Sequence, residues 1–130
     1  MRLVARGPGA TILGPMLSKL FLVVLVIIAA AVLYMRFSAV RISGRDARDL
    51  VAKGALLLDV RSPGEFAGGH IDGAISIPVQ ELVGRMDELG DKSGEIVVYC
   101  QSGSRSAMAK RLLESNGFAS VHDLGGIRQW

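Results

Sequence analysis

The sequence predicts an α/β domain with a small, mainly parallel central sheet flanked by helices, preceded by one transmembrane helix. Residues 20–35 read LFLVVLVIIAAAVLYM, 16 residues without a charge. After residue 38, short apolar runs of strand length alternate with segments of helical spacing, which is typical of a buried parallel sheet. The 130 residues are therefore expected to divide into a short basic segment at 1–15, a transmembrane helix at 16–37 and one folded domain at 38–130.

The apolar run is long enough to cross a membrane. Twenty helical residues rise about 30 Å, the thickness of a hydrocarbon core. Extending the run back to Met16 adds one charged residue, Lys19, whose long side chain can place its charge at the membrane interface. A cleaved signal peptide is the alternative, because Arg2 and Arg6 precede the run and the alanines at 29–31 resemble a cleavage site. The apolar residues that continue past these alanines favour a retained anchor.

The excess of basic over acidic residues lies in the first 36 residues of the chain. The formal net charge is +3, and residues 1–36 hold four of the 15 basic residues and no acid. Residues 37–130 therefore carry 11 basic and 12 acidic residues, without a basic cluster. This pattern predicts no binding to nucleic acid. Four arginines at 36, 41, 45 and 48 slightly outnumber the basic residues before the span, which favours a cytoplasmic domain.

The first elements of the domain are a strand and a capped helix. The residues at 40–42 predict a short strand. Ser43 and Asp46 fit a helix N-cap and capping box, leading into a helix at 47–53 that Gly54 ends.

The next segment predicts two strands with a turn between them. A continuous apolar strand is expected at 55–60, followed by a turn at 62–64 and a short irregular or helical piece at 65–69. Another short strand is expected at 74–77, ended by Pro78.

The last third predicts a helix, a strand, a second helix and a closing strand. Five apolar residues at helical spacing predict a helix over Val79, Leu82, Val83, Met86 and Leu89. A strand at 95–99 precedes a helix at 104–115, whose Met108, Leu112 and Leu113 are expected to share a face and which ends at Asn116-Gly117. A strand at 119–124 closes the domain.

The single cysteine, Cys100, lies where the strand at 95–99 ends and a Gly/Ser loop opens into the next helix. Free N–H groups of such a loop and of a first helical turn carry partial positive charge, which favours the thiolate. A buried, inert cysteine is the alternative, but Gly103 and Arg105 so close behind it favour a reactive site. One cysteine cannot form an intrachain disulfide or a zinc site by itself, and we predict neither a metal nor a cofactor.

These motifs resemble the rhodanese-like family. The stretch LLLDVRSPGEFAGGHIDGAISIP at 56–78 is similar to the family's Asp-x-Arg, Glu-Phe, Gly-His-Ile and Gly-Ala-x-x-Ile-Pro succession. The stretch IVVYCQSGSRSAMAKRLLESNGF at 96–118 resembles its active-site strand, loop and helix, and GGIRQW at 125–130 its closing motif. A single span before such a domain is a bacterial arrangement, which implies a single-pass protein of the inner membrane.

The resemblance implies a sulfurtransferase that works through Cys100. The cysteine would take the outer sulfur of a donor such as thiosulfate, become a persulfide, and pass the sulfur to a thiol or cyanide. We expect the loop N–H groups to form an anion nest around this sulfur, in which Gly103 has a positive φ and Arg105 neutralises the donor's sulfonate. The nest residues are Gln101, Ser102, Gly103, Ser104, Arg105 and Ser106.

The residues behind the loop are expected to support it. Asp59 would do so by hydrogen bonding, and Arg61 and Glu65 would pair with each other across the turn at 62–64. His70 is expected to be architectural. Packing or surface roles are expected for Met108, His122 and Trp130.

Two other functions remain open at this point. Related folds include dual-specificity phosphatases, but their loops place five residues between the cysteine and the arginine, whereas four separate Cys100 from Arg105. A non-enzymatic persulfide carrier or protein-docking module at the membrane is the second alternative. Related domains continue about ten residues beyond the position of Trp130, so we expect a protein partner or the membrane-proximal segment to cover that edge, or the edge to remain marginal.

Overall fold

The computed structural model describes residues 13–38 and 40–130, and the chain divides into two compact units at residues 36 and 37. The described part of the first unit is helical and belongs to α1 (Leu13–Ser38), whose last two residues fall in the second unit. Within it, the 23 residues Leu13–Met35 have a mean hydropathy of 2.8, and none of them is buried. A helix of this length and composition can cross a membrane, and a signal sequence near an N-terminus has the same properties. The expected basic segment at 1–15 lies largely outside the described residues.

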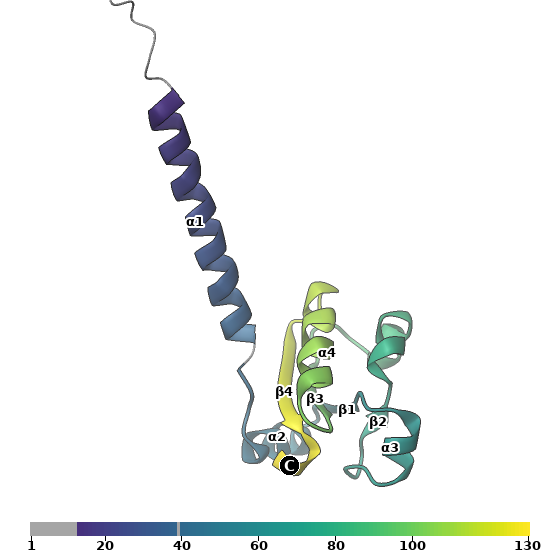
Figure 1. Ribbon diagram of the computed structural model, residues 1–130. Helices are drawn as coiled ribbons and strands as arrows, with labels where there is room; N and C mark the ends of the chain where they lie inside the picture. The colour runs from purple at the N-terminus through teal and green to yellow at the C-terminus, as the bar shows by residue number, and fades with distance from the viewer. Residues whose placement is uncertain (1–12, 39) are drawn as a thin grey trace, which may run out of the picture. The chain divides into compact units, whose positions relative to one another are not determined.

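The second unit is the predicted α/β domain. Its strands are β1 (Leu56–Asp59), β2 (Ile75–Ser76), β3 (Glu95–Cys100) and β4 (Ser120–Gly126). They pair in the order β2-β1-β3-β4, and every pair is parallel. Figure 1 shows β3 and β4 side by side with α4 in front of them. The fold class that the sequence predicts is confirmed.

Helices cover both faces of the sheet. On one face, α4 (Ser104–Ser115) and η1 (Val79–Leu89) pack in a core that includes Leu58, Val98 and Leu113. On the other face, α2 (Gly44–Ala52) packs in a smaller core around Val97 and Leu124. Because both faces are buried, the strands are continuously apolar rather than alternating, as the sequence indicates.

Capping residues set where α2 and α3 (Pro63–Ala67) begin. The Ser43 side chain accepts a hydrogen bond from the N–H of Asp46, which confirms the predicted cap of α2. The turn expected at 62–64 is instead the start of α3, because Ser62 and Glu65 form a complete capping box and Pro63 occupies the first helical turn.

The helix at 79–89 differs from the expectation. It is a 3₁₀ helix with a kink at Arg85, where φ is −128°. A three-residue period buries Val79 and Leu82 but leaves Val83 58% exposed. Met108 of α4 is likewise 53% exposed, so the apolar face expected for α4 is wrong at that position.

The strand expected at 40–42 is reduced to one bridge at the outer edge of the sheet. Arg41 pairs with Asp123 in the parallel sense, and the N–H of Ile42 donates to the Asp123 carbonyl oxygen at 2.9 Å. At the end of the chain, the short η2 (Ile127–Gln129) brings Trp130 against the core that α2 covers. The segment at 40–42, which follows the apolar helix, therefore occupies part of the β4 edge.

Candidate active site

The carboxyl ends of three neighbouring strands place the candidate residues together. Cys100, the last residue of β3, pairs with Gly126, the last residue of β4, and Asp59 ends β1 on the other side. Ligands of parallel α/β sheets bind beyond these ends. The loop between β3 and α4 therefore lies where a substrate site is expected.

Cys100 is fully buried inside this loop. The N–H of Gly103 donates to its Sγ at 2.9 Å, and the Ser106 Oγ lies 3.5 Å from the same sulfur. Gly103 has φ of 106°, the left-handed conformation that the sequence predicts. This conformation turns the loop back on itself, so that its N–H groups face Sγ.

The loop lowers the pKa of Cys100. Burial acts to raise the pKa of this thiol, but a hydrogen bond to the Ser106 hydroxyl and those from three backbone N–H groups outweigh burial. The three N–H groups belong to Ser106, Gly103 and Ser102. The net pKa lies below the ordinary value of 9.0, so the thiolate forms at a lower pH than in an unperturbed cysteine.

A buried ion pair supports the loop from β1. Arg61 Nη2 lies 2.7 Å from Asp59 Oδ2, and these side chains are 4% and 0% exposed. Arg61 also donates to the Gln101 Oε1 at 3.1 Å and to the Gly69 carbonyl oxygen at 2.8 Å. The expected pairing of Arg61 with Glu65 is wrong, because Arg61 folds back onto the carboxylate of Asp59, two residues earlier at the end of β1.

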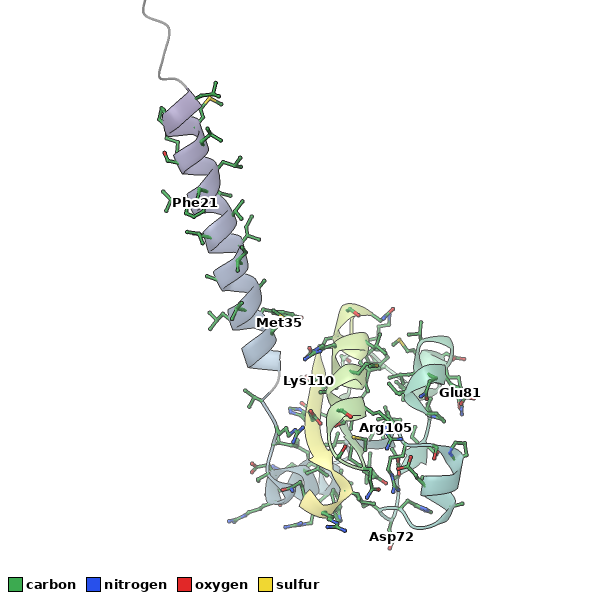
Figure 2. The ribbon with its side chains drawn as sticks, viewed as in Figure 1. Phe21, Met35, Asp72, Glu81, Arg105 and Lys110 are labelled. Carbon is green, nitrogen blue, oxygen red and sulfur yellow. The ribbon has the colours of Figure 1, made fainter. Side chains whose placement is uncertain are left out.

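Glu65 instead pairs with Arg105, from the first turn of α4. Arg105 Nη1 and Nη2 lie 2.6 and 3.0 Å from the two carboxylate oxygens, a bidentate geometry. Figure 2 labels Arg105 at the start of α4. The hydrogen bonds from Arg105 hold the pKa of Glu65 down to about 2. The cation expected to meet the donor is therefore already paired with a carboxylate 40 residues earlier in the chain.

The remaining predicted loop residues form the rim. Gln101, Ser102 and Ser104 are exposed, and the Gln101 side chain is turned toward Arg61. His70 stacks on Phe66 with ring centroids 3.7 Å apart and lies 2.9 Å from the Phe66 carbonyl oxygen through its Nδ1. This geometry agrees with an architectural role.

Two buried residues near the site are missing from the sequence interpretation. The Tyr99 hydroxyl accepts from the N–H of Ile71 at 3.2 Å, and burial raises the pKa of Tyr99 to about 12. Asp123 is 1% exposed and accepts from the N–H of Gly125 at 2.8 Å. A single acid within an apolar strand is the signal that could have identified Asp123, as it did Asp59. Residues 13–38 and 40–130 include no group of three or more His, Cys, Asp or Glu placed to hold a metal ion.

Comparison with known proteins identifies the family. The sequence model of the rhodanese-like domain matches residues 43–130. The chain belongs to the rhodanese-like family. It is a single rhodanese-like domain of the sulfurtransferase type, with an apolar helix before it.

Relatives from bacteria and a human structure show how far the similarity extends. The uncharacterized protein YqhL of Bacillus subtilis is 39% identical over 117 residues, which cover 84% of this chain and 91% of YqhL. The thiosulfate sulfurtransferase PspE of Escherichia coli is 36% identical over 72 residues, 55% of this chain and 69% of PspE. The human single-domain sulfurtransferase TSTD1 has a TM-score of 0.63 and 33% identity, covering 69% of this chain and 93% of that chain.

Proposed function

We propose that this chain is a membrane-anchored sulfurtransferase that moves a sulfane sulfur through a persulfide on Cys100. The donor is a small molecule such as thiosulfate, and the acceptor is a thiol or cyanide. Residues 16–37 form the anchor and residues 38–130 the rhodanese-like domain. The observation that carries this proposal is the Gly103 N–H at 2.9 Å from Sγ, within a loop that lowers the thiol pKa. The name of the relative PspE, a thiosulfate sulfurtransferase, supports the choice of donor.

The transfer proceeds in two displacements at sulfur. The Cys100 thiolate attacks the outer sulfur of thiosulfate, a new S–S bond forms, and the old S–S bond breaks as sulfite leaves with the electron pair. An acceptor thiolate or cyanide then attacks the outer sulfur of the persulfide, and Cys100 leaves as the thiolate. The loop N–H groups stabilise the negative charge in each state. Because Cys100 has no exposed surface, the donor enters as the exposed rim side chains move aside.

The hydroxyl of Ser106 can change its hydrogen-bond acceptor when the thiol of Cys100 loses its proton. Its Oγ lies 3.1 Å from the Gly103 carbonyl oxygen and 3.5 Å from Sγ. A hydroxyl has one hydrogen, so it donates to the carbonyl while the thiol is protonated and turns to Sγ when the thiolate forms. This switch lets one side chain stabilise the thiolate without leaving a polar atom unpaired in the resting thiol.

A persulfide on Cys100 is the first expected result. The full chain, isolated in detergent without reductant and treated with thiosulfate, should gain the mass of one sulfur atom on the peptide that contains Cys100. Cyanide should remove this sulfur and yield thiocyanate. Mass spectrometry of the digest measures both steps. A peptide that never gains sulfur contradicts the persulfide route, and a loaded peptide that transfers its sulfur to no acceptor supports the carrier alternative.

Arg105 is proposed to hold the donor's sulfonate while it keeps its pair with Glu65. Glu65 occupies one N–H on each terminal nitrogen, and a guanidinium has five N–H groups. We therefore expect Arg105→Ala to raise KM for thiosulfate by about tenfold, with a smaller change in kcat, because a charge-assisted hydrogen bond contributes about 1.5–3 kcal/mol. Steady-state kinetics at several thiosulfate concentrations measure this effect.

Arg111→Ala is the matched control for Arg105→Ala. Arg111 is an exposed arginine on the same helix, and its replacement removes the same charge from the chain. We expect its KM to equal that of the unmodified protein. A KM for thiosulfate that is the same in both variants would show that the backbone nest alone holds the anion.

Retention of the apolar helix is the third expected result. If residues 16–37 are an anchor, the mature protein keeps its N-terminus and stays with membranes in high salt and in carbonate, because apolar burial holds it there. A soluble chain that begins near Val32 would show cleavage instead. For a cytoplasmic domain, an impermeant thiol reagent should label Cys100 only after the cells are permeabilised.

A further inference from the structure

The guanidinium of Arg41 lies against the loop that holds Cys100. A Cβ added to Gly103 would lie 2.6 Å from Cζ and 3.1 Å from Nη1 of Arg41. A Cβ added to Gly125 would lie 3.0 Å from Cδ and 3.1 Å from Nε of the same side chain. The arginine therefore runs across the Cα atoms of both glycines. Both have positive φ, 106° at Gly103 and 87° at Gly125.

A buried carboxylate draws Arg41 to this position. Its Nε lies 3.9 Å from Oδ2 of Asp123, and the two side chains are 50% and 1% exposed. Asp123 Oδ1 accepts from the N–H of Gly125, whereas Oδ2 has no hydrogen-bond partner within the described part of the chain. A buried carboxylate with one free oxygen attracts a neighbouring cation strongly. Asp123 thus hydrogen-bonds the N–H of Gly125 and attracts the arginine that covers this glycine.

Ser106 contacts the same two glycines through their carbonyl groups. Its Oγ lies 3.1 Å from the Gly103 carbonyl oxygen and 3.5 Å from that of Gly125. Gly103 and Gly125 are therefore held by Ser106 through their carbonyls and by Arg41 across their Cα atoms. Gly103 also donates the 2.9 Å hydrogen bond to Sγ. A change in the position of Gly103 would therefore weaken this hydrogen bond to the sulfur.

We propose that Arg41 is a positioning residue for Cys100, which it serves by holding Gly103 and Gly125 in place. It belongs to the segment that joins the apolar helix to the domain, and it lies before residue 43, where the match to the family's sequence model begins. The loop that holds Cys100 thus depends on the segment that follows the apolar helix. The inference relies on the proposed function only in taking Cys100 as the nucleophile.

Alkylation of Cys100 in the full chain tests this role without any sulfur transfer. The probes are iodoacetamide, which is neutral, and iodoacetate, which is an anion, both reacting with the single thiol. We expect Arg41→Ala to slow both reactions by about the same factor, roughly threefold or more at neutral pH, because a weakened hydrogen bond to the sulfur disfavours the thiolate. The pH at which the rate is half-maximal should move upward. Arg41→Lys should recover part of the rate, since it keeps a cation beside Asp123.

Arg48→Ala is the matched control, an exposed arginine of α2 whose loss changes the net charge equally. Rates in Arg41→Ala that equal those in Arg48→Ala overturn the proposal. Slowing of iodoacetate alone also overturns it, because that result shows attraction of an anion rather than positioning of the sulfur. If Arg41→Ala does not fold, Arg41→Gln replaces it with the same expected outcome. Failure of the persulfide experiment with the alkylation result intact would reject the proposed function and leave the role of Arg41 standing.

Discussion

We expect Cys100→Ser to lower the rate of sulfur transfer from thiosulfate to cyanide by roughly a thousandfold or more, because a serine hydroxyl stays protonated at neutral pH and attacks sulfur poorly. The hydrogen bonds that lower the pKa of the thiol cannot bring a hydroxyl into the same range. Thiocyanate formation by the full chain in detergent measures the rate. The effect should appear in kcat rather than in KM, since the nest that binds the donor is unchanged.

The variant should keep the fold of the unmodified protein. A serine oxygen can accept the Gly103 N–H and donate to Ser106, so the loop loses no hydrogen-bonding partner. Equal far-ultraviolet circular dichroism and a similar melting temperature would show this. Ser115→Ala, at the exposed end of α4, serves as a control with unchanged activity. Transfer at the normal rate in Cys100→Ser would remove the persulfide from the mechanism.

Arg61→Ala is expected to destabilise the domain by about 3–5 kcal/mol, because it leaves the Asp59 carboxylate buried without its cation. The Arg61 side chain bonds both oxygens of Asp59, and after its removal the carboxylate would keep the backbone N–H of residue 61 at 2.9 Å. For a domain of this size the melting temperature should fall by roughly 10 °C or more. Thermal unfolding of the detergent-solubilised chain, followed by circular dichroism, measures the shift.

Arg85→Ala is the matched comparison for this variant. Arg85 also bonds carboxylates on two sides, Glu81 and Glu88, but all three side chains are exposed to solvent. Water and salt screen such pairs, so we expect a much smaller change in melting temperature. A fall in Arg61→Ala no larger than that in Arg85→Ala would contradict the role given to the buried pair. Arg61→Lys should lie between the two, since it keeps the charge but not the planar fork.

Local chemistry explains why several elements are predictable from the sequence. Ser43 caps α2 and Asn116-Gly117 ends α4 because capping is decided by residues within one turn. Helical spacing predicts a helix at 79–89, yet the structure has a kinked 3₁₀ helix there, and its packing against α4 decides which of its residues are buried. Side-chain direction at Val83 and Met108 depends on packing that spacing alone does not fix.

By itself, the sequence determined the fold class, the apolar helix, the position of Cys100 at the end of a strand, and the left-handed turn at Gly103. Each of these features depends on composition or on neighbours a few residues away in the sequence. Only the tertiary structure decided the charge pairs. Glu65 meets Arg105 across 40 residues, and Arg41 reaches Gly103 from the β4 edge of the sheet, 62 residues earlier in the chain. Parallel strands are joined through long crossovers, and their register brings residues that are remote in sequence together at the carboxyl ends of the strands. The sequence alone does not specify this register.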